Sequence, residues 1–150
     1  FEEPIRDQQR LLLRQLQQSV RTPLLVGETC RFADFHLNLC DGVFPLVRGD
    51  ALIKGGVMGL RKLMAAAETF GVDLEIHTAN TPLIDIAQLH VACACQNTRF
   101  IENHHPIFRF GIKDNPLEAD ANGNVEVPEK PGLGVDLDWD WIDDHTAAVR

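Results

Sequence analysis

Apolar and polar positions along residues 1–102 follow one repeating scheme. A short apolar stretch ends in an ionisable residue, and a loop and an amphipathic segment follow it. In residues 7–21 the side chains of Leu12, Leu13 and Leu16 fall on one helical face, which predicts a helix. The other predicted helices span residues 32–39, 57–70 and 82–95, with Gly71 as the stop of the third and Pro82 in the first turn of the fourth. The predicted strands span residues 1–2, 23–28, 43–50, 72–77 and 99–102.

A titratable side chain ends each of these strands. These residues are Glu2, Glu28, Asp50, His77 and Glu102. They recur about every 25 residues, which is the length of one β-loop-α-loop unit. Strands that alternate with helices predict an α/β fold with parallel strands, whose C-terminal ends face the same way and bind ligands. We therefore expect the five side chains to converge on one site.

Five strands leave the sheet incomplete. An eight-stranded barrel needs roughly 250 residues, and an open sheet of five parallel strands exposes two edges. Two interpretations remain: the C-terminal part of a (β/α)-barrel, carrying its last five strands, or an open doubly wound sheet. The opening Phe1-Glu2-Glu3-Pro4 resembles the tail of a strand and lacks an initiator Met, so we expect the chain to be a piece of a longer polypeptide.

The pattern stops after Glu102. Residues 103–134 are rich in Pro, Gly, Asn and Asp, and Asn122-Gly123 is a hairpin-turn signal. Residues 135–144 alternate apolar and acidic positions, which predicts an edge strand or cover segment with Leu137, Trp139 and Trp141 packed inward. We expect residues 1–102 to form a partial barrel that carries the site, and residues 103–150 to form an irregular C-terminal cover.

Charge narrows the classes of partner. The chain has 14 basic and 22 acidic residues, a net charge of −8. This disfavours nucleic acid and anionic membranes, which need a cationic face, and no apolar run is long enough to span a bilayer. An anionic substrate would need a local positive charge, for which a metal ion is the obvious candidate. The four cysteines lack paired zinc spacing, and we expect reduced thiols in a cytoplasmic protein.

Two pairs of strand ends carry the candidate chemistry. Glu2 and Glu28 offer hard oxygen ligands that suit Mg²⁺, with Glu3 as an alternative to Glu2 and a further carboxylate expected from an earlier strand. Asp50 and His77 end neighbouring strands, about 5 Å apart. There the carboxylate can fix the imidazole tautomer and make a general base.

Other polar residues near these ends are expected to play smaller parts. Glu102 would be protonated and donate a hydrogen bond to developing negative charge. Lys54 could be a base, but a solvated loop lysine is the favoured interpretation. His104 and His105 could touch substrate, although the structural interpretation is preferred. A metal, a base and an acid together suggest removal of a proton beside a carboxylate.

These residues resemble the enolase superfamily, specifically its mandelate racemase-like group. The matching stretches are Phe1-Glu2-Glu3-Pro4, Val26-Gly27-Glu28, residues 50–59 (DALIKGGVMG), Ile76-His77, Phe100-Ile101-Glu102 and residues 131–135 (PGLGV). The resemblance implies that Glu2 and Glu28 bind Mg²⁺. It makes Asp50 and His77 a catalytic dyad and Glu102 the partner of the substrate carboxylate. The family's N-terminal capping domain, Lys-bearing second strand and Asp ligand on the third strand do not lie in this chain.

The resemblance also implies a reaction. Most members with an Asp–His dyad resemble acid-sugar dehydratases, which give a 2-keto-3-deoxy acid, and a racemase or epimerase of a 2-hydroxy acid uses the same dyad. A non-catalytic α/β module and a barrel enzyme that binds phosphate at residues 54–62 (KGGVMGLRK) remain as alternatives from other classes. We expect a small carboxylate substrate, no nucleic-acid or membrane partner, and a homo-oligomer.

Overall fold

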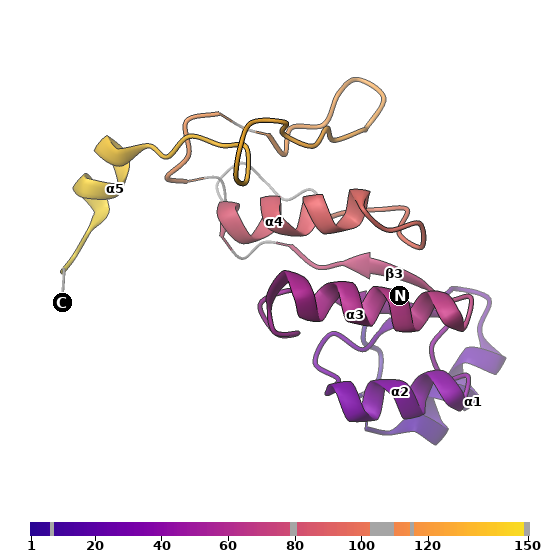
Figure 1. The fold of residues 1–150 in the computed structure, drawn as a ribbon. Coiled ribbons are helices and arrows are strands. Elements are labelled where there is room, and N and C mark those ends of the chain that lie inside the picture. The colour runs from indigo at the N-terminus through magenta and orange to yellow at the C-terminus, as the bar shows by residue number, and fades with distance from the viewer. Residues whose placement is uncertain (7, 79–80, 103–109, 115, 149–150) are drawn as a thin grey trace.

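A computed structural model describes residues 1–6, 8–78, 81–102, 110–114 and 116–148. Its helices are α1 (Arg10–Ser19), α2 (Phe32–Cys40), α3 (Gly56–Thr69), α4 (Pro82–Cys93) and α5 (Trp139–His145). Its strands are β1 (Leu25–Val26), β2 (Leu46–Gly49) and β3 (Asp73–Ile76). Strands and helices alternate up to α4, as predicted, and the C-terminal third of the chain runs outside the sheet (Figure 1). None of the helices in this described part combines the length and apolar character that a membrane crossing would need.

The sheet is parallel and follows chain order. β1 pairs with β2, and β2 pairs with β3. Parallel bridges extend both edges, from Glu2 to Leu25 and from Ile76 to Ile101, at the first and last predicted strands. A doubly wound sheet reverses its strand order at a switch point. Here five strand segments lie side by side in the order of the chain, as they do in a (β/α)-barrel. The fold class predicted from the sequence, part of such a barrel, is confirmed.

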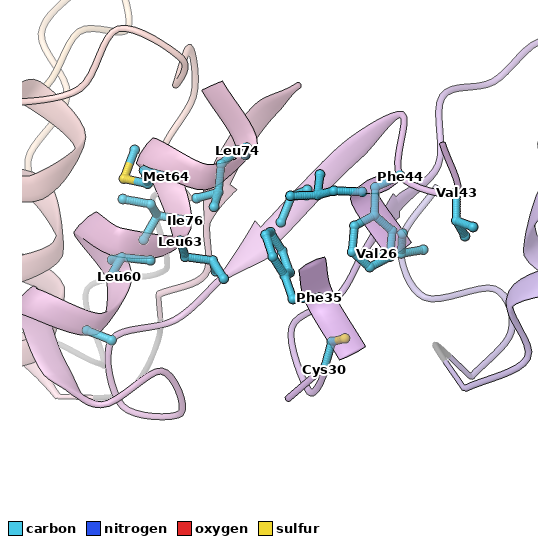
Figure 2. Packing of buried hydrophobic residues seen from close by; sticks show 14 of the residues in the cluster. Val26, Cys30, Phe35, Val43, Phe44, Leu60, Leu63, Met64, Leu74 and Ile76 are labelled. Carbon is cyan, nitrogen blue, oxygen red and sulfur yellow. The ribbon is translucent and has the colours of Figure 1, made fainter. Parts of the chain in front are cut away.

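One face of the sheet packs against the helices. Val26, Val47, Leu74 and Ile76 are fully buried on this face, where residues of α2 and α3 meet them (Figure 2). Gly49 allows the closest approach, because a Cβ built there would lie 2.8 Å from Leu60 Cδ1 of α3. This layer is the main hydrophobic core, and it fixes the positions of the strand ends.

The opposite face of the sheet is polar. Strand alternation places Arg48 and Asp50 on this face of β2, and Glu75 and His77 on the same face at β3. Arg48 and Glu75 are direct partners in the parallel register. In a closed barrel this face lines the interior, and active sites lie at the C-terminal ends of the strands. Asp50 and His77 directly follow the last residues of β2 and β3, so they lie at that end.

Two predicted helix boundaries are confirmed. Pro82 occupies the first turn of α4. α3 ends at Thr69, and Gly71 then takes a left-handed φ of 66° that only glycine adopts easily. Helical segments therefore begin and end where the punctuating residues predict.

The C-terminal segment covers α4 and differs from prediction at its end. Residues 112–137 contribute to a second apolar cluster with Ile86 and Leu89 of α4. The turn at Asn122-Gly123 forms, with Asp120 N–H donating to Asn124 O at 2.8 Å. Of the two alternatives expected over residues 135–144, an edge strand or a cover segment, the edge strand is wrong beyond Leu137, because residues 139–145 form α5.

The acidic residues explain this helix. The carboxylate of Asp138 accepts a hydrogen bond from Trp141 N–H at 3.2 Å and caps α5, and Asp140 lies in its first turn. Trp139 is 61% exposed, so the expectation that it packs inward is wrong. Trp141 makes stacked ring contacts with Phe110 and with His145. In Figure 1, α5 projects away from the sheet.

Candidate active site

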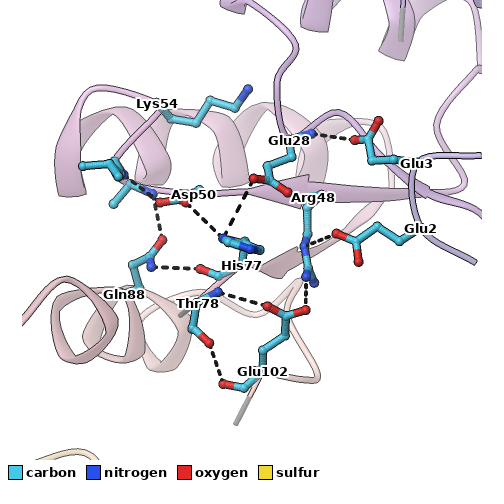
Figure 3. A network of polar contacts seen from close by, with 12 residues as sticks. Glu2, Glu3, Glu28, Arg48, Asp50, Lys54, His77, Thr78, Gln88 and Glu102 are labelled. Atoms are coloured by element: carbon cyan, nitrogen blue, oxygen red, sulfur yellow. Dashed lines mark hydrogen bonds and ion pairs between the residues drawn. The ribbon is translucent and has the colours of Figure 1, made fainter. Parts of the chain in front are cut away.

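Asp50 and His77 lie at adjoining ends of β2 and β3. His77 Nδ1 is 3.1 Å from Asp50 Oδ2 (Figure 3). A carboxylate accepts this hydrogen bond from Nδ1–H, and in the neutral imidazole with that tautomer Nε2 is the acceptor atom. Asp50 Oδ1 also accepts from Leu52 N–H at 2.7 Å, and the Asp50 side chain is only 2% exposed. A buried, fixed carboxylate therefore orients an imidazole that is more open to solvent.

Glu28 completes a group that could hold a metal ion. Its Oε1 lies 3.9 Å from His77 Nδ1. One ligand atom each from Glu28, Asp50 and His77 fall within 4.8 Å of one another, and no other such group occurs among residues that the structure describes. Carboxylate oxygens suit a hard divalent cation. Asp50 and His77 Nδ1 already contact each other at 3.1 Å, and of the predicted metal ligands only Glu28 belongs to this group.

Glu2 and Glu3 are placed differently from each other. Glu3 Oε1 accepts hydrogen bonds from the N–H groups of Gly27, at 2.8 Å, and Glu28, at 3.1 Å. Glu3 thus holds the backbone that presents Glu28. The Glu2 carboxylate lies 3.0 Å from Arg48 Nε and outside the Glu28–Asp50–His77 group. The role of Glu2 as a ligand stays a prediction, and it requires this carboxylate to turn away from Arg48.

Arg48 joins the two outer strand ends. Its side chain is 3% exposed, and its guanidinium forms ion pairs with both Glu2 and Glu102. Sequence reasoning missed this residue. Its position two residues before Asp50 would have found it, because positions i and i+2 of a strand share a face.

Glu102 is held as an acceptor. Its Oε1 pairs with Arg48, and its Oε2 accepts from Thr78 N–H at 3.1 Å. Thr78 Oγ1 also donates to the Glu102 carbonyl at 2.9 Å. A cation and an N–H donor favour the ionised carboxylate, which differs from the protonated form expected from the sequence.

Glu75 shares this polar face. Burial raises the pKa of its carboxyl above the ordinary value of 4.5. Arg48, its partner across the register, lowers the pKa, and nearby carboxylates such as Asp73 raise it again. Burial raises the pKa of Glu75 more than Arg48 lowers it, so a negative charge at Glu75 costs folding free energy. Arg48 also pairs with Glu2 and Glu102, so its charge is shared among several carboxylates.

Lys54 and Gln88 support the site from outside it. The favoured interpretation of Lys54 as a solvated loop residue is wrong, because it is 2% exposed and its Nζ donates to the carbonyls of Gly27, at 3.0 Å, and Cys30. The turn after β2 folds back over the turn after β1, so Lys54 braces the backbone on both sides of Glu28. Gln88, which no sequence pattern marked, is fully buried beside the dyad. His104 and His105 lie outside the described residues.

Comparisons with known proteins agree on one family. A family model described as enolase C-terminal domain-like matches residues 1–141. The chain is 30% identical over 150 residues to a D-xylonate dehydratase from Haloferax volcanii, covering 97% of the chain and 36% of the relative. It is 31% identical over 137 residues to an arabinonate dehydratase from Saccharolobus solfataricus, covering 89% and 36%. The chain thus spans just over a third of these curated relatives.

Solved structures give the same result. A candidate mandelate racemase/muconate lactonizing enzyme from Pseudovibrio sp. superposes with a TM-score of 0.90 at 30% identity, over 98% of this chain and 40% of that one. An enolase from Agrobacterium radiobacter, solved with Na and L-malate bound, gives a TM-score of 0.84 at 25% identity, over 95% and 40%. Both fold and sequence therefore match over nearly the whole chain.

Proposed function

The chain belongs to the enolase C-terminal domain-like family, and from that membership we propose that the protein containing it dehydrates an acid sugar to a 2-keto-3-deoxy acid. The proposed substrate is an aldonate. Relatives that are named dehydratases of xylonate and arabinonate support this substrate class. A racemase or epimerase on the same scaffold is the alternative, and it shares the first step.

The contact between Asp50 and His77 carries the proposal. With Nδ1 donating to Asp50, the Nε2 lone pair of His77 removes the proton beside the substrate carboxylate. Asp50 stabilises the imidazolium that results, because its carboxylate accepts the hydrogen bond from His77 Nδ1–H. His77 then returns the proton to the departing β-hydroxyl, which leaves as water. The base and the acid of the reaction are thus the same side chain in two protonation states.

Glu28 and Glu2 are the proposed ligands of Mg²⁺. Glu28 belongs to the group of side chains that could hold a metal ion, and Glu2 would join it by turning away from Arg48. Mg²⁺ bound there would stabilise the negative charge that develops on the substrate carboxylate when the proton leaves. We expect Glu28→Gln to weaken Mg²⁺ binding measured by calorimetry on the full-length protein.

The contacts of Glu102 distinguish two roles toward the substrate, hydrogen-bond acceptor and hydrogen-bond donor. An ionised Glu102, paired with Arg48, accepts a hydrogen bond from a substrate hydroxyl, whereas a protonated Glu102 would donate one. Glu102→Gln removes the negative charge and introduces an N–H donor. We expect this variant to lower kcat/KM about 10-fold or more; wild-type kcat/KM would show that a neutral donor suffices there.

The decisive experiment uses the full-length protein with its upstream segment. Xylonate, arabinonate, gluconate and galactonate are each incubated with and without Mg²⁺, and 2-keto acid formation and substrate stereochemistry are followed. Keto-acid formation that requires Mg²⁺ supports the dehydratase. Stereochemical inversion without keto acid identifies the racemase. Failure of all four substrates to lose the proton beside the carboxylate would contradict the proposed reaction class.

A further inference from the structure

Gln88 connects the backbones of the two dyad residues. It lies in the middle of α4 and is fully buried. Its Oε1 accepts from Ala51 N–H at 2.7 Å, and its Nε2 donates to the His77 carbonyl at 2.9 Å (Figure 3). Ala51 directly follows Asp50. One amide side chain therefore holds the chain at both partners of the 3.1 Å contact.

The hydrogen bond from Ala51 N–H to Gln88 also affects the Asp50 carboxylate, because both are part of the turn after β2. Asp50 Oδ1 accepts from Leu52 N–H at 2.7 Å, next to the Ala51 N–H that Gln88 holds. α4 supplies the fixed point, because Ile86 and Leu89 anchor it in the second apolar cluster. The position of one carboxylate thus depends on a hydrogen bond made from a helix nearly forty residues further along the chain.

We propose that Gln88 is a positioning residue for the reaction, which sets the distance between Asp50 and His77 without touching substrate. This inference rests on the proposed function for its catalytic consequence. The claim that Gln88 sets the spacing of Asp50 and His77 depends only on its hydrogen bonds to Ala51 N–H and the His77 carbonyl. Partners that orient metal ligands from behind are typically worth about 10- to 100-fold in activity, and misplacing reacting groups by about 1 Å can cost about 100-fold, so we expect an effect of this order for Gln88.

Asn97 provides the matched control. It is also a buried amide with two hydrogen bonds, and its Nδ2 donates to the carbonyls of Met64 and Val72 at 3.0 and 3.2 Å. These partners lie near the N-terminal end of β3, away from Asp50 and His77. Replacing Asn97 therefore removes comparable buried hydrogen bonds without moving the dyad.

The test compares Gln88→Met, Gln88→Glu and Asn97→Leu in the full-length protein, by thermal unfolding and by kcat and KM on the aldonate that turns over. Gln88→Met keeps the length and loses both hydrogen bonds, so we expect kcat to fall about 10- to 100-fold with KM changed less than about threefold. Gln88→Glu keeps the acceptor for Ala51 and should fall between Met and wild type. Asn97→Leu should lower Tm and leave kcat at the wild-type value.

Two results would overturn the inference: wild-type kcat in Gln88→Met, or an equal loss of kcat in Asn97→Leu. If Gln88→Met does not fold, Gln88→Glu decides by the same criteria. If the wild-type protein turns over no aldonate, the proposed function has failed. The positioning role of Gln88 is then tested by comparing crystal structures of the wild type and Gln88→Met. A longer Asp50–His77 contact in Gln88→Met than in wild type then supports the positioning role, and an unchanged contact refutes it.

Discussion

Replacing Arg48 by Met should uncouple the two outer strand ends. The substitution keeps an apolar stem and removes the cation that pairs with Glu2 and Glu102. Breaking a fully buried pair costs about 3–5 kcal/mol when the remaining charge stays buried. Here the side chains of Glu2 and Glu102 are 42% and 29% exposed, so water reaches both carboxylates after the change. We therefore expect a loss of about 1–3 kcal/mol in the free energy of unfolding.

A double-mutant cycle measures the part of this loss that comes from Glu102. Urea unfolding is compared for Arg48→Met, Glu102→Gln and the double variant of the full-length protein. Once Glu102 is neutral, Arg48→Met should cost less, giving a coupling energy of about 1 kcal/mol. Arg48→Lys, which keeps charge but lacks the forked guanidinium, should lie between wild type and Met. Additive effects of the two single changes would refute the ion pair as a stabilising link.

Two further changes test how the polar face is supported. Lys54→Met removes hydrogen bonds to two carbonyls on either side of Glu28, so it should lower the free energy of unfolding by about 1–3 kcal/mol in urea; an unchanged midpoint would show that water replaces Nζ. The pKa of the Glu75 carboxyl is raised above 4.5 by burial, so its ionised form costs stability above the folded-state pKa, and the cost disappears as pH falls below the unfolded-state value. Glu75→Gln should therefore raise Tm at pH 7, with the gain vanishing near pH 4, whereas an equal gain at both pH values would exclude titration as its cause.

The positions of the strand ends could be predicted because they depend on local pattern. Short apolar runs followed by helical periodicity locate each strand, and a parallel sheet then brings the ends of successive strands together. Asp50 and His77 meet for this reason, although their separation in the chain is large. Which carboxylate pairs with which cation could not be read in the same way, because Arg48 forms ion pairs with two carboxylates, Glu2 and Glu102, that lie far apart in the chain.

Residues that act through backbone groups left no pattern to detect. The partners of Gln88 are an N–H and a carbonyl, which every position of the chain offers, so a glutamine in the middle of a helix predicts nothing by itself. α5 was missed for another reason. Alternating Trp and Asp residues fit a short strand as well as one helical turn, and the capping carboxylate of Asp138 decides between them.

The role of His77 as the base can be measured by the release of label from an aldonate that carries deuterium on the carbon beside its carboxylate. We compare three full-length proteins: the wild type, His77→Asn, and a control, His36→Asn, whose residue is exposed on α2. Thermal unfolding first checks that the three have the same Tm. His77→Asn should slow the release of deuterium to water at least about 100-fold because the base is missing, while His36→Asn should release it at the wild-type rate. Wild-type release from His77→Asn would contradict the assignment of His77 as the base.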